Sequence, residues 1–139
     1  PFALGLTTGK TPIGLYRELV KRHKAGEVSF ANVAVYSLDE FYPIKPTEKQ
    51  SRNYRIHEEM LNHIDIKAEN INFPDGTLPR EELSAFCANY DKAHIDLMII
   101  GIGENAHIAF NDPPADFDTK EAYIIVNLDE GFHFTCQRL

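Results

Sequence analysis

Residues 95–113, IDLMIIGIGENAHIAFNDP, bring the most reactive side chains of the sequence together. An apolar run typical of a buried strand ends in a glycine turn, which contains Gly103. His107 follows, close to Asn105 and Asp112. An imidazole exchanges protons near neutral pH, and α/β enzymes place such groups in tight loops at the carboxyl edge of their sheet. The segment predicts a catalytic loop centred on His107.

A pair of acidic residues, Asp39 and Glu40, follows a second apolar run, NVAVYSL. Asp39 stands at the end of this predicted strand, where a partly desolvated carboxylate serves as a general base. Glu40 has two open interpretations, a solvated turn residue or a group that contacts a ligand.

A third candidate is the turn TTGKTP at residues 7–12. It lacks the first glycine of a nucleotide-binding P-loop, because Leu4 stands at that position. A glycine-threonine turn before a helix still presents N–H groups and hydroxyls to an anion. We therefore expect an anion site; the alternative is a plain connection with Thr11 as the helix N-cap. The expected anion-binding residues, which we call the anion turn, are Thr8, Gly9, Lys10 and Thr11.

Cofactor and metal motifs are weak. GIGENA fits the dinucleotide pattern G-x-G-x-x-A, but the prolines and polar residues that follow make a poor long helix. The histidines lack metal-ligand spacing, and two cysteines make neither a zinc site nor a disulfide framework. We expect no cofactor and no metal.

Composition limits the partners. The 139 residues suit one domain, residues 1–139, and the formal charge of −7 argues against nucleic acid and anionic membranes. No apolar run reaches the length of a membrane span. Few cysteines and no signal peptide favour a cytoplasmic protein. Because the chain starts and stops within apolar runs, we expect a domain that is incomplete at both ends.

Strands and helices are expected to alternate. This order predicts an α/β fold, a doubly wound, mostly parallel sheet with helices on both faces, in which the polar loops share one rim. The expected strands are 2–7, 32–38, 71–73, 95–101 and 122–128; the expected helices are 13–24, 51–63 and 79–93; residues 39–50 are expected to form a loop, and His133 has no predicted place.

Together these segments resemble the glucosamine-6-phosphate deaminase (isomerase) family. LGLTTGKTP, LDEFY and GIGENAHIAFNDP are similar to the family's LGL-T-G-TP, LDEY and GIG-DGHIAFNEP patterns. The resemblance covers nearly the whole chain, and HIAFN is its most specific part.

The resemblance implies a metal-free, Rossmann-like cytoplasmic enzyme of amino-sugar metabolism that forms a homo-oligomer. It would convert glucosamine 6-phosphate and water to fructose 6-phosphate and ammonia. By position, residues 8–11 would hold the phosphate, with Glu40 and Gly103 also near the substrate. Asp39 would move a proton between C2 and C1. His107 would open the sugar ring, supported by residues on each side.

Those supporting residues depart from the family pattern. Asn105 stands where an acid is usual, Asp112 replaces a glutamate, Ala106 replaces a glycine and Lys10 replaces a small residue. An amide orients an imidazole but stabilises its charged form less. We expect altered ring opening or a different hexosamine phosphate.

Two other functions are open. A 6-phosphogluconolactonase, a lactone hydrolase, shares the fold but has a different run after its histidine than IAFN. A non-catalytic sugar-phosphate sensor would keep the anion turn and lose the catalytic groups, whereas this chain keeps Asp39 and His107. A further alternative is a purely structural domain, in which the three polar loops at strand ends would have come together by chance and would have no chemical role.

Overall fold

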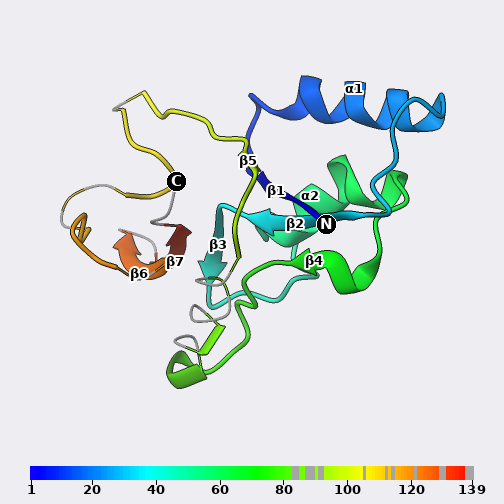
Figure 1. The fold of residues 1–139 in the computed structure, drawn as a ribbon. Helices are drawn as coiled ribbons and strands as arrows, with labels where there is room; N and C mark the ends of the chain where they lie inside the picture. The colour runs from blue at the N-terminus through cyan, green and yellow to red at the C-terminus, as the bar shows by residue number, and fades with distance from the viewer. Residues whose placement is uncertain are drawn as a thin grey trace.

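The computed structural model describes residues 1–82, 85–86, 90, 93–104, 106–111, 113, 115–120, 122–128 and 131–136. Two sheets and two α-helices, joined by long loops, form the framework of the structure (Figure 1). A four-stranded sheet has the order β4-β2-β1-β5, and a three-stranded sheet has the order β3-β7-β6.

The four-stranded sheet is parallel. It contains β1 (Phe2–Leu6), β2 (Val33–Ser37), β4 (Ile71–Asn72) and β5 (Leu97–Met98). The chain moves from β1 outward to β2 and β4, and then returns to the other side of β1 to form β5. This reversal is the switch point of a doubly wound sheet, where ligands bind beyond the carboxyl ends of the strands.

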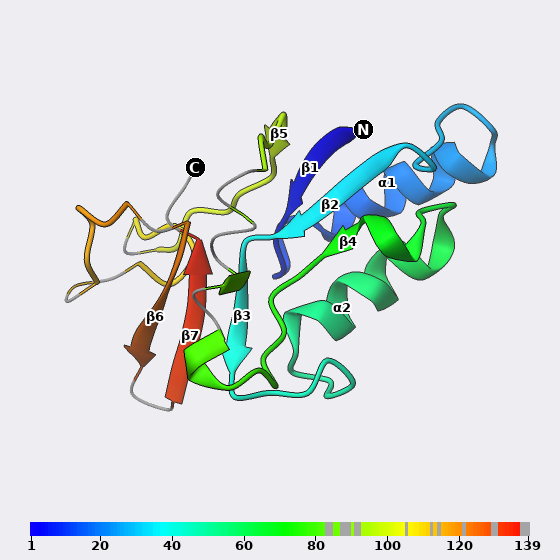
Figure 2. The same cartoon turned by 60° about the horizontal axis from the view of Figure 1, so that its bottom comes forward.

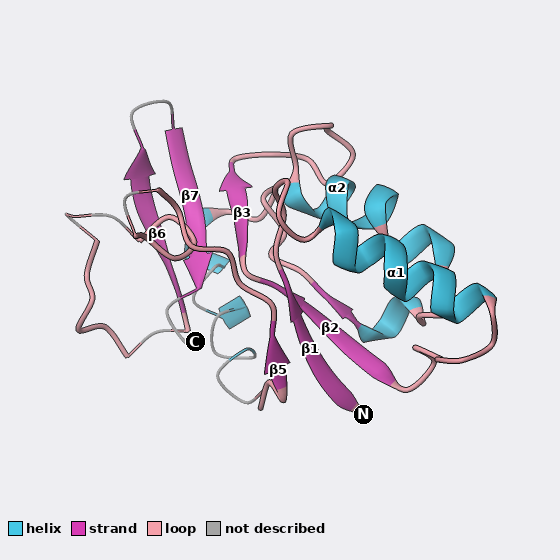
Figure 3. Ribbon diagram, turned by 90° about the horizontal axis from the view of Figure 1, so that it is seen from above, coloured by secondary structure: helices cyan, strands magenta, loops and turns pink. Residues whose placement is uncertain are grey.

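Helices α1 (Ile13–Lys24) and α2 (Arg52–Glu59) lie side by side on one face of this sheet (Figure 3). Each follows a strand on the same outward path, so right-handed crossovers place both on that face. The short 3-10 helices Leu61–His63 and Ala68–Asn70 complete the return to β4. The core beneath the helices is made by Leu4, Leu6, Tyr16, Phe30, Val35, Ile56, Met60, Leu61 and Phe73.

The opposite face carries an aromatic cluster. Tyr90 packs edge-on against Tyr36 of β2, with ring centroids 5.2 Å apart, and the Phe86 ring lies tilted against Tyr90, with centroids 4.7 Å apart. The sequence predicted a helix over 79–93. The structure gives a 3-10 helix at Arg80–Glu82 and helical residues at 85, 86 and 90, while the rest lies outside the described residues.

The second sheet is antiparallel (Figure 2). Its strands are β3 (Asp39–Tyr42), β6 (Tyr123–Leu128) and β7 (Gly131–Cys136). The sequence placed 39–42 in a loop, and this was wrong: β3 pairs with β7, a partner almost a hundred residues away that no local pattern reveals. His133, which had no predicted place, lies in β7 opposite Phe41.

The α/β class with a mostly parallel, doubly wound sheet is confirmed, with an antiparallel sheet added beside it. The predicted fourth strand, 122–128, exists but belongs to the added sheet. Within the described residues, no helix has both the length and the apolar character to cross a membrane.

Candidate active site

Backbone hydrogen bonds hold the carboxyl ends of three strands together. The Leu38 N–H donates to the Leu6 carbonyl at 2.8 Å, just beyond β2, and the Ile99 N–H donates to the Gly5 carbonyl at 2.9 Å, just beyond β5. The loops that leave β1, β2 and β5 therefore start side by side. They carry the anion turn, Asp39 and the His107 loop, as the sequence predicted.

Tyr16 anchors the start of the anion turn. This fully buried side chain of α1 donates its hydroxyl to the Thr7 carbonyl at 2.6 Å and accepts from the Thr7 N–H at 3.1 Å. Both interactions fix the backbone that enters the turn. Burial raises the pKa of the Tyr16 hydroxyl, which stays neutral and keeps its donor.

The turn itself is open to solvent. Gly9 has a φ of +115°, a conformation that side chains rarely adopt, while Lys10 and Thr11 are exposed. The alternative in which Thr11 caps α1 is not observed, because Pro12 occupies the N-cap position and no side chain caps the helix. Among the residues that the structure describes, the first N–H groups of α1 therefore have no side-chain acceptor.

Asp39 is buried at the junction of the two sheets, with 4% of its surface exposed. The Ser37 hydroxyl donates to the Asp39 carbonyl at 2.8 Å, and the Tyr123 hydroxyl of β6 donates to the Ser37 carbonyl. Burial raises the pKa of the Asp39 carboxyl to about 6, against the opposing effect of the Arg52 charge. Its backbone is fixed from both sheets, and its carboxyl titrates close to neutral pH.

Arg52 is a site residue that the sequence analysis missed. Its Nε lies 3.4 Å from Asp39 Oδ2, and its guanidinium lies 4.5 Å from the centroid of the Phe41 ring. An arginine on a polar helix is normally expected to be exposed. The one feature of the sequence that could have indicated its role is its position as the first residue after the helix N-cap, Ser51. That end of α2 faces β3.

Glu40 is not the solvated turn residue of one of the two interpretations, because only 1% of its surface is exposed. Its buried carboxylate accepts hydrogen bonds from the Ser51 hydroxyl and from the backbone N–H groups of Phe41, Arg52 and Asn53, at 2.8–3.0 Å. These four protein donors occupy about all the acceptor sites of the carboxylate. Glu40 instead caps α2, where a negative charge is favourable.

His107 lies in a tight loop closed by an isolated bridge between Ile102 and Ile108. The Gly103 N–H donates to the His107 carbonyl at 2.9 Å, and the imidazole packs against the Gly103 α-carbon. Ala106 has a φ of +65°, at the position where the GIG-DGHIAFNEP pattern has a glycine. The loop keeps that glycine-type conformation with alanine in its place.

A chain of contacts joins His107 to Asp39. The His107 ring stacks on Phe110, with centroids 6.2 Å apart, and the Phe110 ring lies 5.4 Å from the guanidinium of Arg52, which pairs with Asp39. The two predicted catalytic groups therefore belong to one cluster. Asn105 and Asp112 lie outside the described residues.

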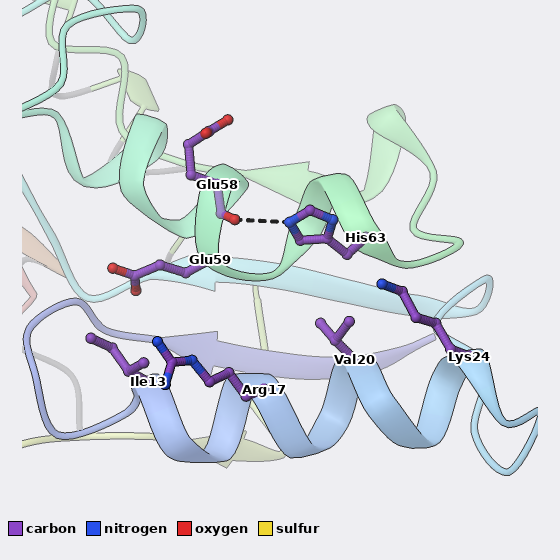
Figure 4. A pocket seen from close by; sticks show the side chains of 7 residues that line it. All are labelled: Ile13, Arg17, Val20, Lys24, Glu58, Glu59 and His63. Atoms are coloured by element: carbon purple, nitrogen blue, oxygen red, sulfur yellow. Dashed lines mark hydrogen bonds between the residues drawn. The ribbon is translucent and has the colours of Figure 1, made fainter.

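Two hollows on the described surface lie away from this cluster. A groove of about 440 Å³ between α1 and α2 is lined by Arg17, Lys24, Glu58, Glu59 and His63 over apolar Ile13 and Val20 (Figure 4). Another is lined by Pro46, Thr47, Asn53, Tyr54, His57, Glu58 and Asn62. Neither includes a predicted site residue. In the described part of the chain, no three potential metal ligands gather in one place.

The fold and the grouped strand-end loops define a Rossmann-like α/β protein with a candidate site at its switch point. The sequence profile described as Glucosamine-6-phosphate isomerases/6-phosphogluconolactonase matches residues 1–130, and the chain belongs to this family. It is 39% identical over 133 residues to glucosamine-6-phosphate deaminase 2 of Bacillus subtilis (strain 168) and 42% identical over 125 residues to the glucosamine-6-phosphate deaminase of Treponema denticola.

These matches cover 92% and 86% of this chain but 52% and 46% of the relatives, so the chain spans about half of their length. A solved monomeric glucosamine-6-phosphate deaminase superposes with a TM-score of 0.85 at 28% identity, covering 97% of this chain and 64% of that one. A 6-phosphogluconolactonase from Thermotoga maritima has a TM-score of 0.80 at 21% identity and shares the fold.

Proposed function

We propose that this protein is a glucosamine-6-phosphate deaminase, which converts glucosamine 6-phosphate and water to fructose 6-phosphate and ammonia. The observation that carries the proposal is the contact chain from Asp39 through Arg52 and Phe110 to His107, in loops whose strand ends lie next to the strand end that leads into the anion turn. The deaminase relatives at about 40% identity support it.

In this proposal the sugar phosphate binds at the turn of Thr8, Gly9, Lys10 and Thr11. The open N–H groups at the start of α1 and the exposed Lys10 ammonium attract the dianion. Tyr16 fixes the approach to this turn through Thr7. A phosphate held here keeps the distant C1 and C2 atoms in register with the proton-transfer groups, which lowers the entropic part of the barrier.

Asp39 is the proposed base of the isomerisation. One carboxylate can take the proton from C2 and return it to C1 of a planar enolamine. Water then adds to the resulting C2 imine, and the C2–N bond breaks to release ammonia. A pKa near 6 leaves Asp39 mostly ionised at neutral pH and keeps its conjugate acid strong enough to return the proton.

His107 is the proposed group for ring opening, which moves a proton from the C1 hydroxyl to the ring oxygen. Gly103 supports it by allowing the imidazole to lie against the backbone. Asn105 and Asp112 are proposed to orient it from either side. The amide at position 105 stabilises a charged imidazole less than a carboxylate would, so we expect slower ring opening or another preferred hexosamine.

The test uses the purified full-length protein with glucosamine 6-phosphate, galactosamine 6-phosphate and 6-phosphogluconolactone. Release of ammonia together with fructose 6-phosphate from the first substrate supports the proposal. Lactone hydrolysis without ammonia selects the lactonase instead, and binding of fructose 6-phosphate with no turnover selects a sensor. Equal, full activity at the level of acid-containing relatives would refute the effect assigned to Asn105.

We place the enzyme in the cytoplasm, in the breakdown of amino sugars. The homo-oligomer expected from the sequence stays a prediction, since one solved deaminase of the same fold is monomeric. Light scattering on the purified full-length protein gives its mass and decides this point.

A further inference from the structure

Arg52 has an environment unlike that of a surface arginine. Its side chain is 13% exposed, and it lies against the Asp39 carboxylate, which is itself 5% exposed. Its guanidinium contacts two aromatic rings, Phe41 at 4.5 Å and Phe110 at 5.4 Å. In the described part of the chain, Asp39 is the sole charged partner that it contacts.

The charges around Asp39 make this contact consequential. Glu40, the next residue along β3, adds negative charge and its carboxylate is committed to the start of α2. In the ladder, β7 places the uncharged Thr135 opposite Asp39 and His133 opposite Phe41. His107 is linked to Arg52 through Phe110. Arg52 is thus the cation in direct contact with a carboxylate that burial and Glu40 both push toward its neutral form.

We infer that Arg52 is a positioning residue of the proposed deaminase reaction, which keeps the Asp39 carboxylate charged and oriented toward the substrate. It acts through Asp39 and does not touch the sugar. Two features serve this role. Its positive charge offsets the effect of burial, which favours the neutral form of the Asp39 carboxyl. Its planar guanidinium packs on Phe41 and Phe110, and this packing holds the charge in place. The inference rests on the proposed function for its kinetic consequences.

A purely structural ion pair on the same helix supplies a matched control. Arg55, one turn further along α2, pairs with Glu59 at 3.3 Å and its side chain is 37% exposed. Substitution of Arg55 removes an arginine from the same helix and breaks an ion pair, but it removes no charge beside Asp39. Any effect common to Arg52 and Arg55 variants is therefore a helix effect.

The experiment compares Arg52→Met, Arg52→Lys and Arg55→Met in the full-length protein. Methionine keeps the packing on the two rings and removes the charge, whereas lysine keeps the charge and loses the planar faces. For Arg52→Met we expect the acid limb of the kcat profile to move up by about one pH unit or more, because an ion-pair partner of a carboxylate shifts its pKa by about that amount, and we expect kcat at pH 7 to fall about twofold or more. KM should stay near the wild-type value.

Activity of Arg52→Met should recover toward the wild-type rate above about pH 8.5, once Asp39 is ionised again. Arg52→Lys should restore the wild-type position of the acid limb, and Arg55→Met should match wild type throughout. An unshifted acid limb in Arg52→Met overturns the inference. So does a rise in KM with unchanged kcat, which would mean that Arg52 contacts the substrate.

A titration that needs no turnover separates this inference from the proposed function. Carbon-13 NMR of the carboxyl groups, with Asp39 assigned by comparison with Asp39→Asn, reports its ionisation directly. An upward shift in Arg52→Met but not in Arg55→Met supports the inference even for a protein that releases no ammonia. No shift in either variant overturns it, whatever the wild-type protein catalyses. Arg52→Gln, which also removes the charge, gives the same readout if the methionine variant does not fold.

Discussion

The imidazole of His107 lies against the α-carbon of Gly103, so that a methyl group added there would fall 2.6 Å from Nε2 and 2.7 Å from Cε1. No real side chain fits at that distance. The neighbouring Gly101 is different, because a methyl group there meets no atom of the described residues within 4 Å. The two glycines of GIG therefore have separate roles, and Gly103 provides the space for the ring.

We expect Gly103→Ala to displace the His107 ring and lower kcat by about 100-fold, the loss typical of a misplaced proton-transfer group. Gly101→Ala is the control and should retain wild-type turnover. Kinetics of both variants, with their folding checked by circular dichroism, test this. Equal losses in the two variants would contradict the assignment.

Tyr16→Phe should loosen the anion turn. It removes the hydroxyl that satisfies both the N–H and the carbonyl of buried Thr7, and unsatisfied buried groups cost about 1–3 kcal/mol. We expect a lower free energy of unfolding in urea and a raised KM for the phosphorylated sugar. Tyr54→Phe, whose hydroxyl makes no hydrogen bond with the described residues, is the matched control.

Asp39→Asn should abolish deamination and change how stability depends on pH. The folded-state pKa of about 6 lies above the ordinary value of 3.8, so the contribution of neutral Asp39 to stability is complete below about pH 4 and is lost as pH rises through about 6. Relative to Asp39→Asn, the wild type should lose about 2 kcal/mol of unfolding free energy between pH 4 and pH 7.

Denaturant titrations at pH 4, 5, 6 and 7 measure this difference, and parallel curves for the two proteins would refute it. Asp65 gives a control of opposite sign. Hydrogen bonds from Ser29 and Phe30 lower the pKa of Asp65, so its contribution is present at neutral pH and is lost as pH falls. Asp65→Asn should therefore diverge from wild type at neutral pH rather than at pH 4.

Glu40→Gln should destabilise the protein by about 3 kcal/mol, since an amide N–H group would face backbone N–H donors that now meet a carboxylate. Glu58→Gln, an exposed change on the same helix, should stay within about 0.5 kcal/mol of wild type. Urea unfolding of the two variants compares them. A stable Glu40→Gln protein with a raised KM would instead restore Glu40 to the substrate-binding groups.

The sequence predicted the features that depend on local patterns. Apolar runs located β1, β2, β5 and β6, and the parallel arrangement then brought Asp39, His107 and the anion turn to one edge. What it missed depends on distant partners. β3 is four residues long beside Pro43, and it is a strand because β7 pairs with it.

The roles of charged residues were missed for the same reason. Glu40 follows Asp39 directly, and both are acidic, yet one carboxylate turns to the end of α2 and the other to the Arg52 side chain. The position of the start of α2 in the fold determines which of the two carboxylates accepts hydrogen bonds from the helix N–H groups and which pairs with Arg52. The residues next to Arg52 in the sequence do not indicate that its guanidinium contacts Phe41 and Phe110, which come from separate segments.

The strand that holds Asp39 has its ladder partner at residues 131–136. During synthesis, the residues of the parallel sheet and of its two helices leave the ribosome first. The ladder hydrogen bonds of Asp39–Tyr42 can form only after nearly a hundred more residues have been added. The candidate site around Asp39 is therefore completed only after the residues of the parallel sheet have been synthesised.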